Sequence, residues 1–485
     1  MTTRRNFIGG AAAVVASAPL GAWAAKPSVP HLTFGVLSEI TVRDKYPENQ
    51  EKLENVLRFF RQKQVDAVAF LGDIMYSGQI HELAKFAESW DKIFPGGRGK
   101  GGSKVELLAV TGDHDAFGWT GRWDKIPKER QETLRFNYGE NAAKTWKRLF
   151  NQEWEVVWKR EVKGYTFIGG QDAQFNPRLE AFISKVAPTL NKNKPFFVLS
   201  HKFPEVPGCG FEYLGKGSEP LTRALSPFSN AVSINAHSHI ALTNERAVWQ
   251  GDFTSISAGS LLASVAEFSY ENMSSVWHPS SKKHVMDIDN NVKDQGGALL
   301  VQVYDDHLNV QRLHVPSECK QLLGPTWKIP LPAQPGGAFD HDKRRAARRP
   351  PQFAATAKLG VEFCPDGHPS LGPSFKCNPC YCVTIPFAKT VKSQRSGESC
   401  RVFDYVVTAK TAGKDPVVRK VVAEGATLPE SMSNVPTKCL FLASELAEGQ
   451  QIKFSVVPRD CFGLEGKPLT KTYLPQVGAD AAKGK

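Results

Sequence analysis

The most regular apolar pattern near the start of the chain predicts a strand, a helix and a second strand. His31–Leu37 and Val65–Leu71 are short runs of apolar and β-branched residues, which is typical of buried strands. Between them, Glu48–Gln64 carries apolar residues at helical spacing. These residues are Leu53, Val56, Leu57 and Phe60. Because a crossover helix joins parallel neighbours, we expect the two strands to be parallel.

The same pattern continues downstream. Three more strand-like runs each lead into polar residues of the kinds that bind metals: Lys104–Val110, Pro195–Ser200 and Ala231–Asn235. His81–Ile93 and Thr133–Phe150 have the periodicity of helices that pack on a sheet. Three later runs predict antiparallel strands that close a second sheet: Phe253–Gly259, Ala298–Tyr304 and Leu308–Val315. Residues 31–329 are therefore predicted to form an α/β, two-sheet sandwich flanked by helices.

The composition changes after this region. Residues 330–351 are rich in Pro and Arg and end in a basic run, Lys343–Pro351, which predicts a solvated linker. Contact of this run with a membrane or a nucleic acid is the alternative. Residues 352–475 show short alternating runs between turn residues, such as Val402–Thr408 and Ile452–Val457, which predict a smaller all-β sandwich domain.

The first residues indicate an export signal. Arg4 and Arg5 precede an apolar, Ala-rich run, and Ala22 and Ala24 offer small residues for cleavage. Residues 1–25 resemble a twin-arginine signal peptide, which predicts a periplasmic or secreted protein. A membrane anchor is the weaker alternative, because the run is short and rich in Ala and Gly. Since no other stretch approaches about 20 apolar residues, we expect no membrane span after signal removal.

The length and net charge of the chain indicate how many domains it has and which kinds of partner it can bind. A chain of 485 residues is long enough for two domains. Lys and Arg number 61 and Asp and Glu 49, so the net charge is +12, which favours anionic partners. No basic stripe with interleaved aromatic residues appears, and nucleic-acid binding is not expected.

Side chains of the kinds that bind metals follow five of the predicted strands. They are Glu39, Asp73, Asp113, His114, Asp115, His201, His237 and His239. Carboxylates and neutral imidazoles are common ligands of divalent metals, and strand ends that converge on one sheet edge would bring them together. Asp73 follows Gly72 at a turn, where both carboxylate oxygens can bridge two cations.

The short motifs around these residues carry a resemblance. The series S-E-I-T, L-G-D-I, T-G-D-H-D, S-H-K and A-H-S-H, in this order, resembles the five-block signature of the calcineurin-like metallophosphoesterases. The match extends from about Leu32 to Val315. It implies a metallophosphoesterase sandwich and the hydrolysis of a phosphomonoester or phosphodiester, with a small phosphorylated substrate.

The resemblance also implies a role for each residue. Asp73 would bridge two metals. Asp113, His201 and His237 would bind the second metal, and Glu39, Thr41 and His239 the first. His114 would face the phosphate and protonate or stabilise the leaving group, and Asp115 would orient His114.

Four positions depart from the family pattern. Glu39 stands where Asp is usual, Thr41 where His is usual, Asp113 where Asn is usual and Ala236 where Gly is usual. Because a neutral hydroxyl is a poor donor to a transition metal, the first metal position is weakened and activity is expected to be low. We expect one or two divalent ions, drawn from manganese, iron, zinc and magnesium. The alternative is a degenerate phosphoesterase-fold protein that binds a phosphorylated or glycan ligand without turnover.

The second half holds most of the nine cysteines. Cys364, Cys377, Cys380, Cys382, Cys400, Cys439 and Cys461 lie there. In an exported protein they predict disulfides, with Cys209 a candidate for the unpaired thiol. A zinc site at Cys364, His368, Cys377 and Cys380 is the alternative.

Two further segments invite interpretation. The tail Gln451–Pro468 resembles the last strands of a fibronectin type III module, and no catalytic set is found around it. The segment Glu267–Asp289 is long enough to form a lid over the site, and a packed surface excursion explains it equally well. Neither the substrate nor the oligomeric state follows from the sequence.

Overall fold

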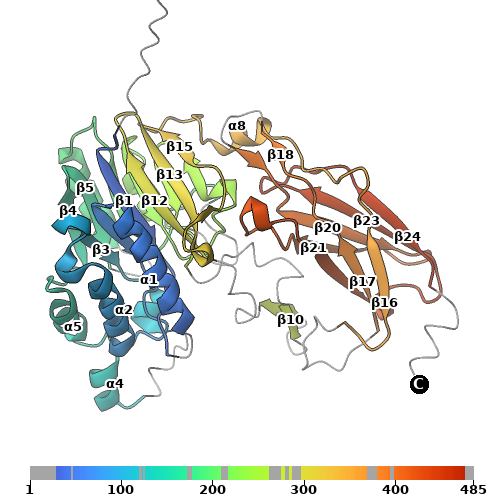
Figure 1. Ribbon diagram of the computed structural model, residues 1–485, viewed down its shortest axis with the longest axis horizontal. Helices are drawn as coiled ribbons and strands as arrows, with labels where there is room; N and C mark the ends of the chain where they lie inside the picture. Colours follow the sequence, from blue (N-terminus) through green and yellow to red (C-terminus); the bar gives the residue numbers. More distant parts are fainter. Residues whose placement is uncertain are drawn as a thin grey trace, which may run out of the picture.

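The computed structural model describes most of the chain outside the N-terminal segment. The described residues are 29–44, 47–118, 123, 126–171, 177–208, 217–261, 275–278, 283–286, 296–368, 379–393 and 398–475. The predicted signal segment, Cys209, Cys377 and most of the predicted lid lie outside them. The ribbon shows a mixed α/β body at the N-terminal side and an all-β body at the C-terminal side (Figure 1).

The first sheet of the α/β domain has the strand order β14-β13-β12-β1-β2-β3, with β15 paired to β13. Its strands are β1 Leu32–Leu37, β2 Ala67–Leu71, β3 Glu106–Val110, β12 Gly297–Val303, β13 His307–His314, β14 Gln321–Leu322 and β15 Trp327–Pro330. β1 pairs with β2 in parallel, and β2 with β3, as the βαβ pattern predicted. The carboxyl ends of these three strands therefore share one edge.

The second sheet has the order β4-β5-β6-β7-β9-β8. Its strands are β4 Val157–Val162, β5 Tyr165–Gly170, β6 Phe196–Ser200, β7 Ala231–Asn235, β8 Val248–Gln250 and β9 Thr254–Ser257. β5, β6, β7 and β9 are parallel neighbours. The ends of β6 and β7 thus lie together, on a different sheet from β1, β2 and β3.

Three strand predictions need correction. Ala298–Tyr304 and Leu308–Val315 are antiparallel, as predicted, but they extend the first sheet because β12 pairs with β1. Phe253–Gly259 contains β9, which lies in the second sheet and is antiparallel to β8, as predicted, but parallel to β7. The β4–β5 hairpin has no counterpart in the sequence analysis, since its outer strand mixes exposed charges with few apolar residues.

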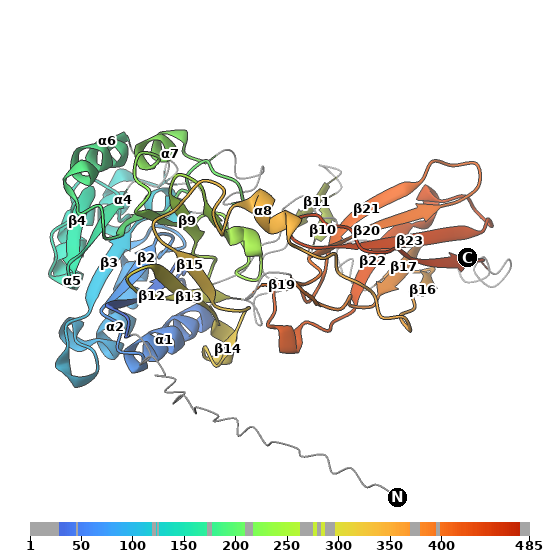
Figure 2. The ribbon, with the colours of Figure 1, turned by 90° about the horizontal axis from the view of Figure 1, so that it is seen from above.

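Helices cover both outer faces of the sheet pair (Figure 2). They are α1 Pro47–Gln62, α2 Ile80–Ile93, α3 Asp113–Phe117, α4 Lys128–Leu134, α5 Asn141–Phe150, α6 Pro177–Val186 and α7 Glu219–Leu225. The single helix predicted over Thr133–Phe150 is two helices, because the chain turns at Gly139, where φ is 53°.

Three apolar layers hold the domain together. Phe34 of β1 packs edge-on against Phe197 of β6, with ring centroids 5.0 Å apart, in the layer between the sheets. Phe60 of α1 lies in the layer between the first sheet and its helices, and Ile183 of α6 in the layer on the second sheet. This α/β/β/α order places the carboxyl ends of both sheets at the same side of the sandwich.

The second domain is all-β. Its larger sheets are β16-β17-β22 and β21-β20-β23-β24, and all of their pairs are antiparallel. The strands are β16 Gly360–Cys364, β17 Cys380–Ile385, β20 Asp404–Lys410, β21 Val417–Val422, β22 Thr437–Leu442, β23 Ile452–Arg459 and β24 Leu469–Tyr473. The short strands β18 Val391–Lys392 and β19 Ser399–Cys400 form a separate two-stranded ribbon. Another two-stranded pair, β10 Ser275–His278 with β11 Lys283–Met286, comes from the part of the chain before the linker. This architecture agrees with the predicted β-sandwich.

The basic run between the domains is not solvated throughout. Helix α8, His341–Ala346, lies between the two bodies (Figure 1). Arg344 and Arg348 are buried, with 0% and 5% of their surface exposed. The prediction of a fully solvated linker is wrong at these two residues, because carboxylates from both domains surround them.

Seven cysteines lie in the described part of the chain, as buried thiols. Cys364 stands opposite Cys380 on adjacent antiparallel strands. One of the four residues of the predicted zinc set, Cys377, lies outside the described residues, and the predicted disulfides stay a prediction. Cys319, buried in the first domain, is a second candidate for the odd thiol besides Cys209.

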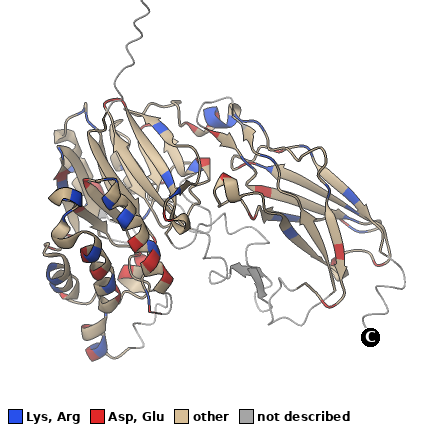
Figure 3. Ribbon diagram, in the orientation of Figure 1, with Lys and Arg blue, Asp and Glu red and all other residues tan. Residues whose placement is uncertain are grey.

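The distribution of charge and of apolar residues adds two observations. Lys and Arg positions are interspersed with Asp and Glu positions on the helices of the first domain (Figure 3). Among the residues that the structure describes, no helix has the length and hydropathy that a membrane crossing requires.

Candidate metal centre

The candidate ligands come from the ends of five strands on two sheets. Asp73 and Asp113 follow β2 and β3 of the first sheet, and His201 and His237 follow β6 and β7 of the second. The prediction of one shared sheet edge is therefore corrected to two facing edges. The ligands meet where the edges of the two sheets face each other, with His201 fully buried and Asp113 and His237 half-buried.

Three ligand atoms form a near-equilateral triangle. Asp113 Oδ1 lies 2.9 Å from His201 Nε2 and 3.1 Å from His237 Nδ1. The two imidazole nitrogens are 3.1 Å apart. Ligand atoms at right angles around one ion, each about 2.1 Å from it, are about 3 Å apart. The triangle therefore has the spacing of three ligands of one octahedral cation.

His201 has a fixed orientation in this triangle. Its Nδ1 lies 2.8 Å from the Leu71 carbonyl oxygen, which can only accept, so Nδ1 carries a proton. The Nε2 lone pair then faces Asp113. A lone pair that faces a carboxylate requires a proton or a metal ion between them.

Asp73 lies beside the triangle. Its Oδ2 is 3.6 Å from His201 Nε2, and its Oδ1 accepts a hydrogen bond from the backbone N–H of His114 at 2.9 Å. A Cβ on Gly112 would lie 2.1 Å from Asp73 Oδ1, and one on Gly72 would lie 2.5 Å from His201 Nδ1. The two glycines make the room in which Asp73 and His201 approach each other.

Glu39 reaches the cluster from the end of β1. Its Oε1 accepts from the backbone N–H of His237 at 2.8 Å, and His239 Nε2 is 2.8 Å from its Oε2. Glu39 is fully buried, and its Oε2 has no partner with hydrogen-bond geometry. A buried carboxylate oxygen of this kind, beside an imidazole, fits a cation ligand.

Five site residues adopt a left-handed backbone. The φ angles are 53° at Glu39, 45° at Thr41, 51° at Asp73, 64° at His237 and 49° at His239. Each costs on the order of 1–3 kcal/mol for a residue other than Gly. Strain that gathers at one place persists only where the surrounding structure holds it, and it is characteristic of functional sites.

The electrostatics of the cluster favour a bound cation. Burial, together with the charges of Glu39 and Asp113, raises the pKa of Asp73 well above its ordinary value. Burial alone would lower the pKa of His201, but Glu39 and Asp113 raise it to about 9. Both shifts follow from negative charge gathered in a buried place, and a divalent cation there would offset that charge.

The donor set fits divalent metal ions. Three groups of side chains have ligand atoms within 4.8 Å of one another: Asp113, His201 and His237; Glu39, Asp73 and His201; and Asp73, Asp113 and His114. Asp73, Asp113 and His201 each belong to two of these groups, so the three groups form one continuous cluster. His239 adjoins the second group through Glu39.

His114 and Asp115 have separate environments. His114 Nδ1 lies 3.0 Å from the Tyr76 carbonyl oxygen, and its Nε2 lies 3.8 Å from Asp73 Oδ2. Asp115 accepts hydrogen bonds from the backbone N–H groups of Met75, at 2.7 Å, and Gly112, at 2.8 Å. Tyr76 thus provides one orienting contact for His114, and Asp115 ties together the turns after β2 and β3. The orienting role of Asp115 stays a prediction.

Thr41 has a partner that the sequence analysis missed. The Nδ2 of Asn49 donates to the Thr41 carbonyl oxygen at 3.1 Å and to its hydroxyl at 3.4 Å. Asn49 is 1% exposed on the buried face of α1, four residues before Leu53. A polar residue in register with the apolar stripe was the signal available in the sequence.

Comparisons with known proteins place these residues in context. Residues 31–241 match the family model of the calcineurin-like phosphoesterases, and this range includes every candidate ligand. The curated proteins contain no match.

Solved structures give weaker similarities. A dimetal phosphatase from Danio rerio is 10% identical over 62% of this chain and 99% of its own, with a TM-score of 0.38. A purple acid phosphatase from yellow lupin, Lupinus luteus, is 12% identical over 59% and 51%, with a TM-score of 0.37. GAP50, the anchor in the inner membrane complex of Plasmodium, is 14% identical over 62% and 88%, with a TM-score of 0.33.

Proposed function

Residues 31–241 belong to the calcineurin-like phosphoesterases, and from this premise we propose that the protein is an exported, metal-dependent phosphoesterase. It would hydrolyse a small phosphomonoester or phosphodiester with water. The observation that carries the proposal is the triangle of Asp113, His201 and His237, with Asp73 and Glu39 beside it.

The residues of the cluster would bind two divalent ions. Asp73, Asp113, His201 and His237 would hold one divalent ion, and Glu39, Asp73 and His239 a second. Bound ions of this kind polarise the phosphoryl oxygens and lower the pKa of a water so that it can attack near neutral pH. Manganese, iron, zinc and magnesium all fit the mixture of carboxylates and imidazoles.

His114 is placed to handle a proton. Its Nδ1 donates to the Tyr76 carbonyl, so Nε2 is the nitrogen that faces Asp73 and the cluster. At the leaving-group oxygen, Nε2 would deliver the proton that an alkoxide requires. Burial lowers the pKa of His114, so its ring is neutral at pH 7 unless the substrate's own negative charge favours protonation.

Two cationic side chains adjoin the cluster and support an anionic substrate. Lys202 follows His201 and interacts electrostatically with Asp113. The Arg43 guanidinium lies 4.1 Å from the ring centroid of Tyr76, whose carbonyl binds His114. Both positions would place positive charge beside a bound phosphate.

Replacement of Asp73 by Asn tests the proposal. The variant keeps the volume of the side chain but removes the charge that would bridge two ions. We expect loss of bound metal, measured by elemental mass spectrometry, and a fall of about three powers of ten or more in the hydrolysis of p-nitrophenyl phosphate and bis(p-nitrophenyl) phosphate. Asp306→Asn, at an exposed turn, is the control. Wild-type activity in Asp73→Asn rules out this site.

A binding protein is the second candidate, and Thr41 favours it. Where the family has an imidazole, this chain has a hydroxyl held by Asn49. A phosphorylated or glycan ligand would then occupy the cluster without turnover. Tight binding of phosphate by a metal-loaded protein that hydrolyses neither nitrophenyl ester would establish this alternative.

Export by the twin-arginine route belongs to the same proposal. The features that support this route are Arg4, Arg5 and the Ala-rich run that follows them. Replacement of both by Lys should retain the unprocessed chain in the cytoplasm, whereas the wild type appears, shortened, in the periplasm or medium. Processing of the Lys variant at the wild-type rate contradicts this route.

A further inference from the structure

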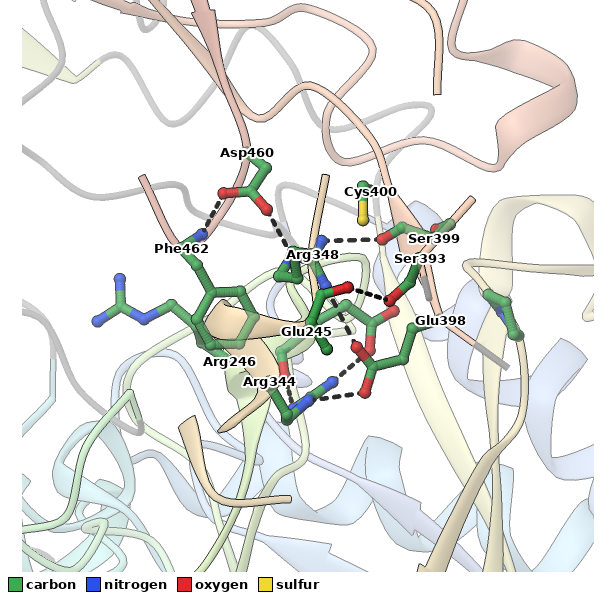
Figure 4. Close-up of polar contacts among 12 residues, drawn as sticks. Glu245, Arg246, Arg344, Arg348, Ser393, Glu398, Ser399, Cys400, Asp460 and Phe462 are labelled. Atoms are coloured by element: carbon green, nitrogen blue, oxygen red, sulfur yellow. Dashed lines mark hydrogen bonds and ion pairs between the residues drawn. The ribbon is translucent and has the colours of Figure 1, made fainter. Parts of the chain in front are cut away.

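The two domains meet through six buried charged side chains, called here the interdomain ion cluster. Its members are Glu245, Arg312, Arg344, Arg348, Glu398 and Asp460 (Figure 4 shows all of these but Arg312 labelled). Three are carboxylates and three are guanidinium groups, so the cluster is balanced in charge. Arg312 and Arg344 are fully buried, and Glu245 is 2% exposed.

Glu245 anchors the cluster in the first domain. Its Oε2 accepts from Arg344 at 2.8 Å and from the Trp327 indole N–H at 2.7 Å, and its Oε1 is 3.0 Å from Arg312. Arg344 also donates to the Glu245 carbonyl oxygen. Both the side chain and the backbone of Glu245 are therefore fixed by guanidinium groups.

The second domain holds the other side of the same guanidinium groups. Arg344 Nε donates to Glu398 Oε1 at 2.9 Å, and Arg348 NH1 lies 3.4 Å from Glu398 Oε2. Arg348 also donates to the Asp460 carboxylate and, at 2.9 Å, to the Ser399 carbonyl oxygen. Arg344 thus bridges a carboxylate of each domain directly.

The cluster is continuous with the loop that carries two candidate ligands. Glu245 is six residues beyond His239, and every residue from 240 to 245 is buried. Arg312 donates to the Leu242 carbonyl oxygen at 2.9 Å, in the middle of this segment. The loop from His237 to Glu245 therefore begins just after strand β7 and ends in the interdomain ion cluster.

This arrangement gives the second domain a role at the metal centre. His237 and His239 hold left-handed backbones, at φ angles of 64° and 49°, which persist only under external constraint. The bond from Arg344 to Glu398 fixes Arg344 against Glu245, and Glu245 ends the loop. We infer that Glu398 of the second domain is a positioning residue for His237 and His239; the inference rests on the proposed function.

The alternative is that the cluster only joins the domains. In that case, loss of Glu398 would lower the stability of the whole protein and leave the loop unchanged in molecules that remain folded. The two cases differ in the local exchange of backbone amides and in the rate of metal release. Both are measured on the folded full-length protein.

Glu398→Gln is the test variant, and Glu445→Gln is its matched control. Glu445 forms an equivalent pair with Arg419, at 2.6 and 2.7 Å, within the second domain. We expect hydrogen exchange in peptides covering residues 236–247 to be faster in Glu398→Gln than in the wild type. We also expect Mn²⁺ loss to a chelator about 10-fold to 100-fold faster, the usual effect of removing a supporting partner. Glu445→Gln should match the wild type in both measurements.

Three other outcomes of these measurements have the following meanings. Wild-type exchange and wild-type Mn²⁺ release in a folded Glu398→Gln protein overturn the inference. If Glu398→Gln does not fold, Arg348→Lys, which keeps the charge but loses the fork that reaches Glu398 and Asp460, takes its place with the same expected results. If the wild type binds no metal, the proposed function fails, and the exchange comparison alone decides whether the domains are coupled.

Discussion

The Nδ2 atom of Asn49 lies 3.4 Å from the hydroxyl of Thr41, the residue proposed to stand in place of a metal-binding imidazole. The same nitrogen donates to the Thr41 carbonyl at 3.1 Å, and Asn49 is almost wholly buried. An imidazole at position 41 would have to share this space with the Asn49 amide. The side chain at position 41 and the buried Asn49 amide are thus one structural feature.

This feature leads to the first prediction. Thr41→His alone should leave the first ion weakly bound, because the ring meets Asn49, whereas Thr41→His with Asn49→Ala should bind a second equivalent of metal and gain hydrolytic rate. Metal content per chain and rates with p-nitrophenyl phosphate, compared across both single variants and the double, separate the contributions. Equal rates in the wild type and the double variant would mean that the site is adapted to Thr41.

The absence of a side chain at Gly112 predicts that a larger residue there would displace the Asp73 carboxylate. The Gly112 φ of −107° suits any residue, but the new Cβ of Gly112→Ala would lie 2.1 Å from Asp73 Oδ1 and 2.6 Å from the Asp73 backbone nitrogen. We expect loss of metal and of activity by at least about tenfold, since the carboxylate must move. Gly101→Ala is the control: its Cβ meets open space, and its φ of 76° predicts a small loss of stability with full metal content. Full metal content in Gly112→Ala contradicts the placement of Asp73.

The role of His114 predicts a dependence on the leaving group. His114→Ala should reduce the hydrolysis of an alkyl phosphate by about 10²-fold to 10⁴-fold, the usual contribution of a general acid. p-Nitrophenyl phosphate, whose leaving group departs without a proton, should lose much less. The ratio of the two rates is the measurement, and equal losses for both substrates would assign His114 to binding or positioning.

Lys202 predicts an effect on substrate affinity. Removal of its charge in Lys202→Ala should raise KM for a phosphomonoester about fivefold, equivalent to ~1 kcal/mol, with little change in kcat. Lys144→Ala, on the exposed face of α5, should leave KM unchanged. A fall in kcat at constant KM would instead connect Lys202 with the chemical step.

Glu82 predicts how stability depends on pH. Its carboxylate is 3% exposed in the first turn of α2 and accepts from the backbone N–H of Ser77 at 2.9 Å. Burial raises its pKa to about 7, from an ordinary 4.5. The folded state therefore binds the proton more tightly, so this contribution is fully present below pH 4.5 and is lost as the pH rises through 7.

The size of the effect can be measured by substitution. Between about pH 4.5 and pH 7, the wild type should lose up to ~3 kcal/mol of unfolding free energy relative to Glu82→Gln, which has no such ionisation. Urea unfolding of both proteins at several pH values gives this difference. A constant difference between them across this range would show that Glu82 ionises at its ordinary pKa.

Much of the fold and most of the candidate ligands could be predicted from local patterns. The strand β2, Ala67–Leu71, is apolar throughout because both of its faces are buried, and the polar residues that follow such strands mark the edge where side chains become available. What the sequence lacks is the pairing of distant strands. Nothing local distinguishes Ala298–Tyr304 as a neighbour of β1, because its apolar pattern suits either sheet.

The basic run shows the other limit of sequence reasoning. Charge density predicted solvation, yet Arg344 and Arg348 are buried because Glu245, Glu398 and Asp460 arrive from positions far away in the chain. A buried ion pair is defined by both partners, and only the fold brings them together. The contact of Tyr76 with His114 and that of Asn49 with Thr41 were missed for a related reason. In each pair the chain turns between the two residues, and only the fold shows that they meet.

The placement of the ligands on two facing sheets has a consequence for the folding of the domain. Asp73 and Asp113 extend from one sheet, and His201 and His237 from the other, so a bound cation would act as a cross-link between the two halves of the sandwich. Any ion that binds only the folded state adds stability in proportion to the logarithm of its concentration over its dissociation constant. Under the proposed twin-arginine export, metal supply before export would set how much of the chain reaches the folded form that such a system carries.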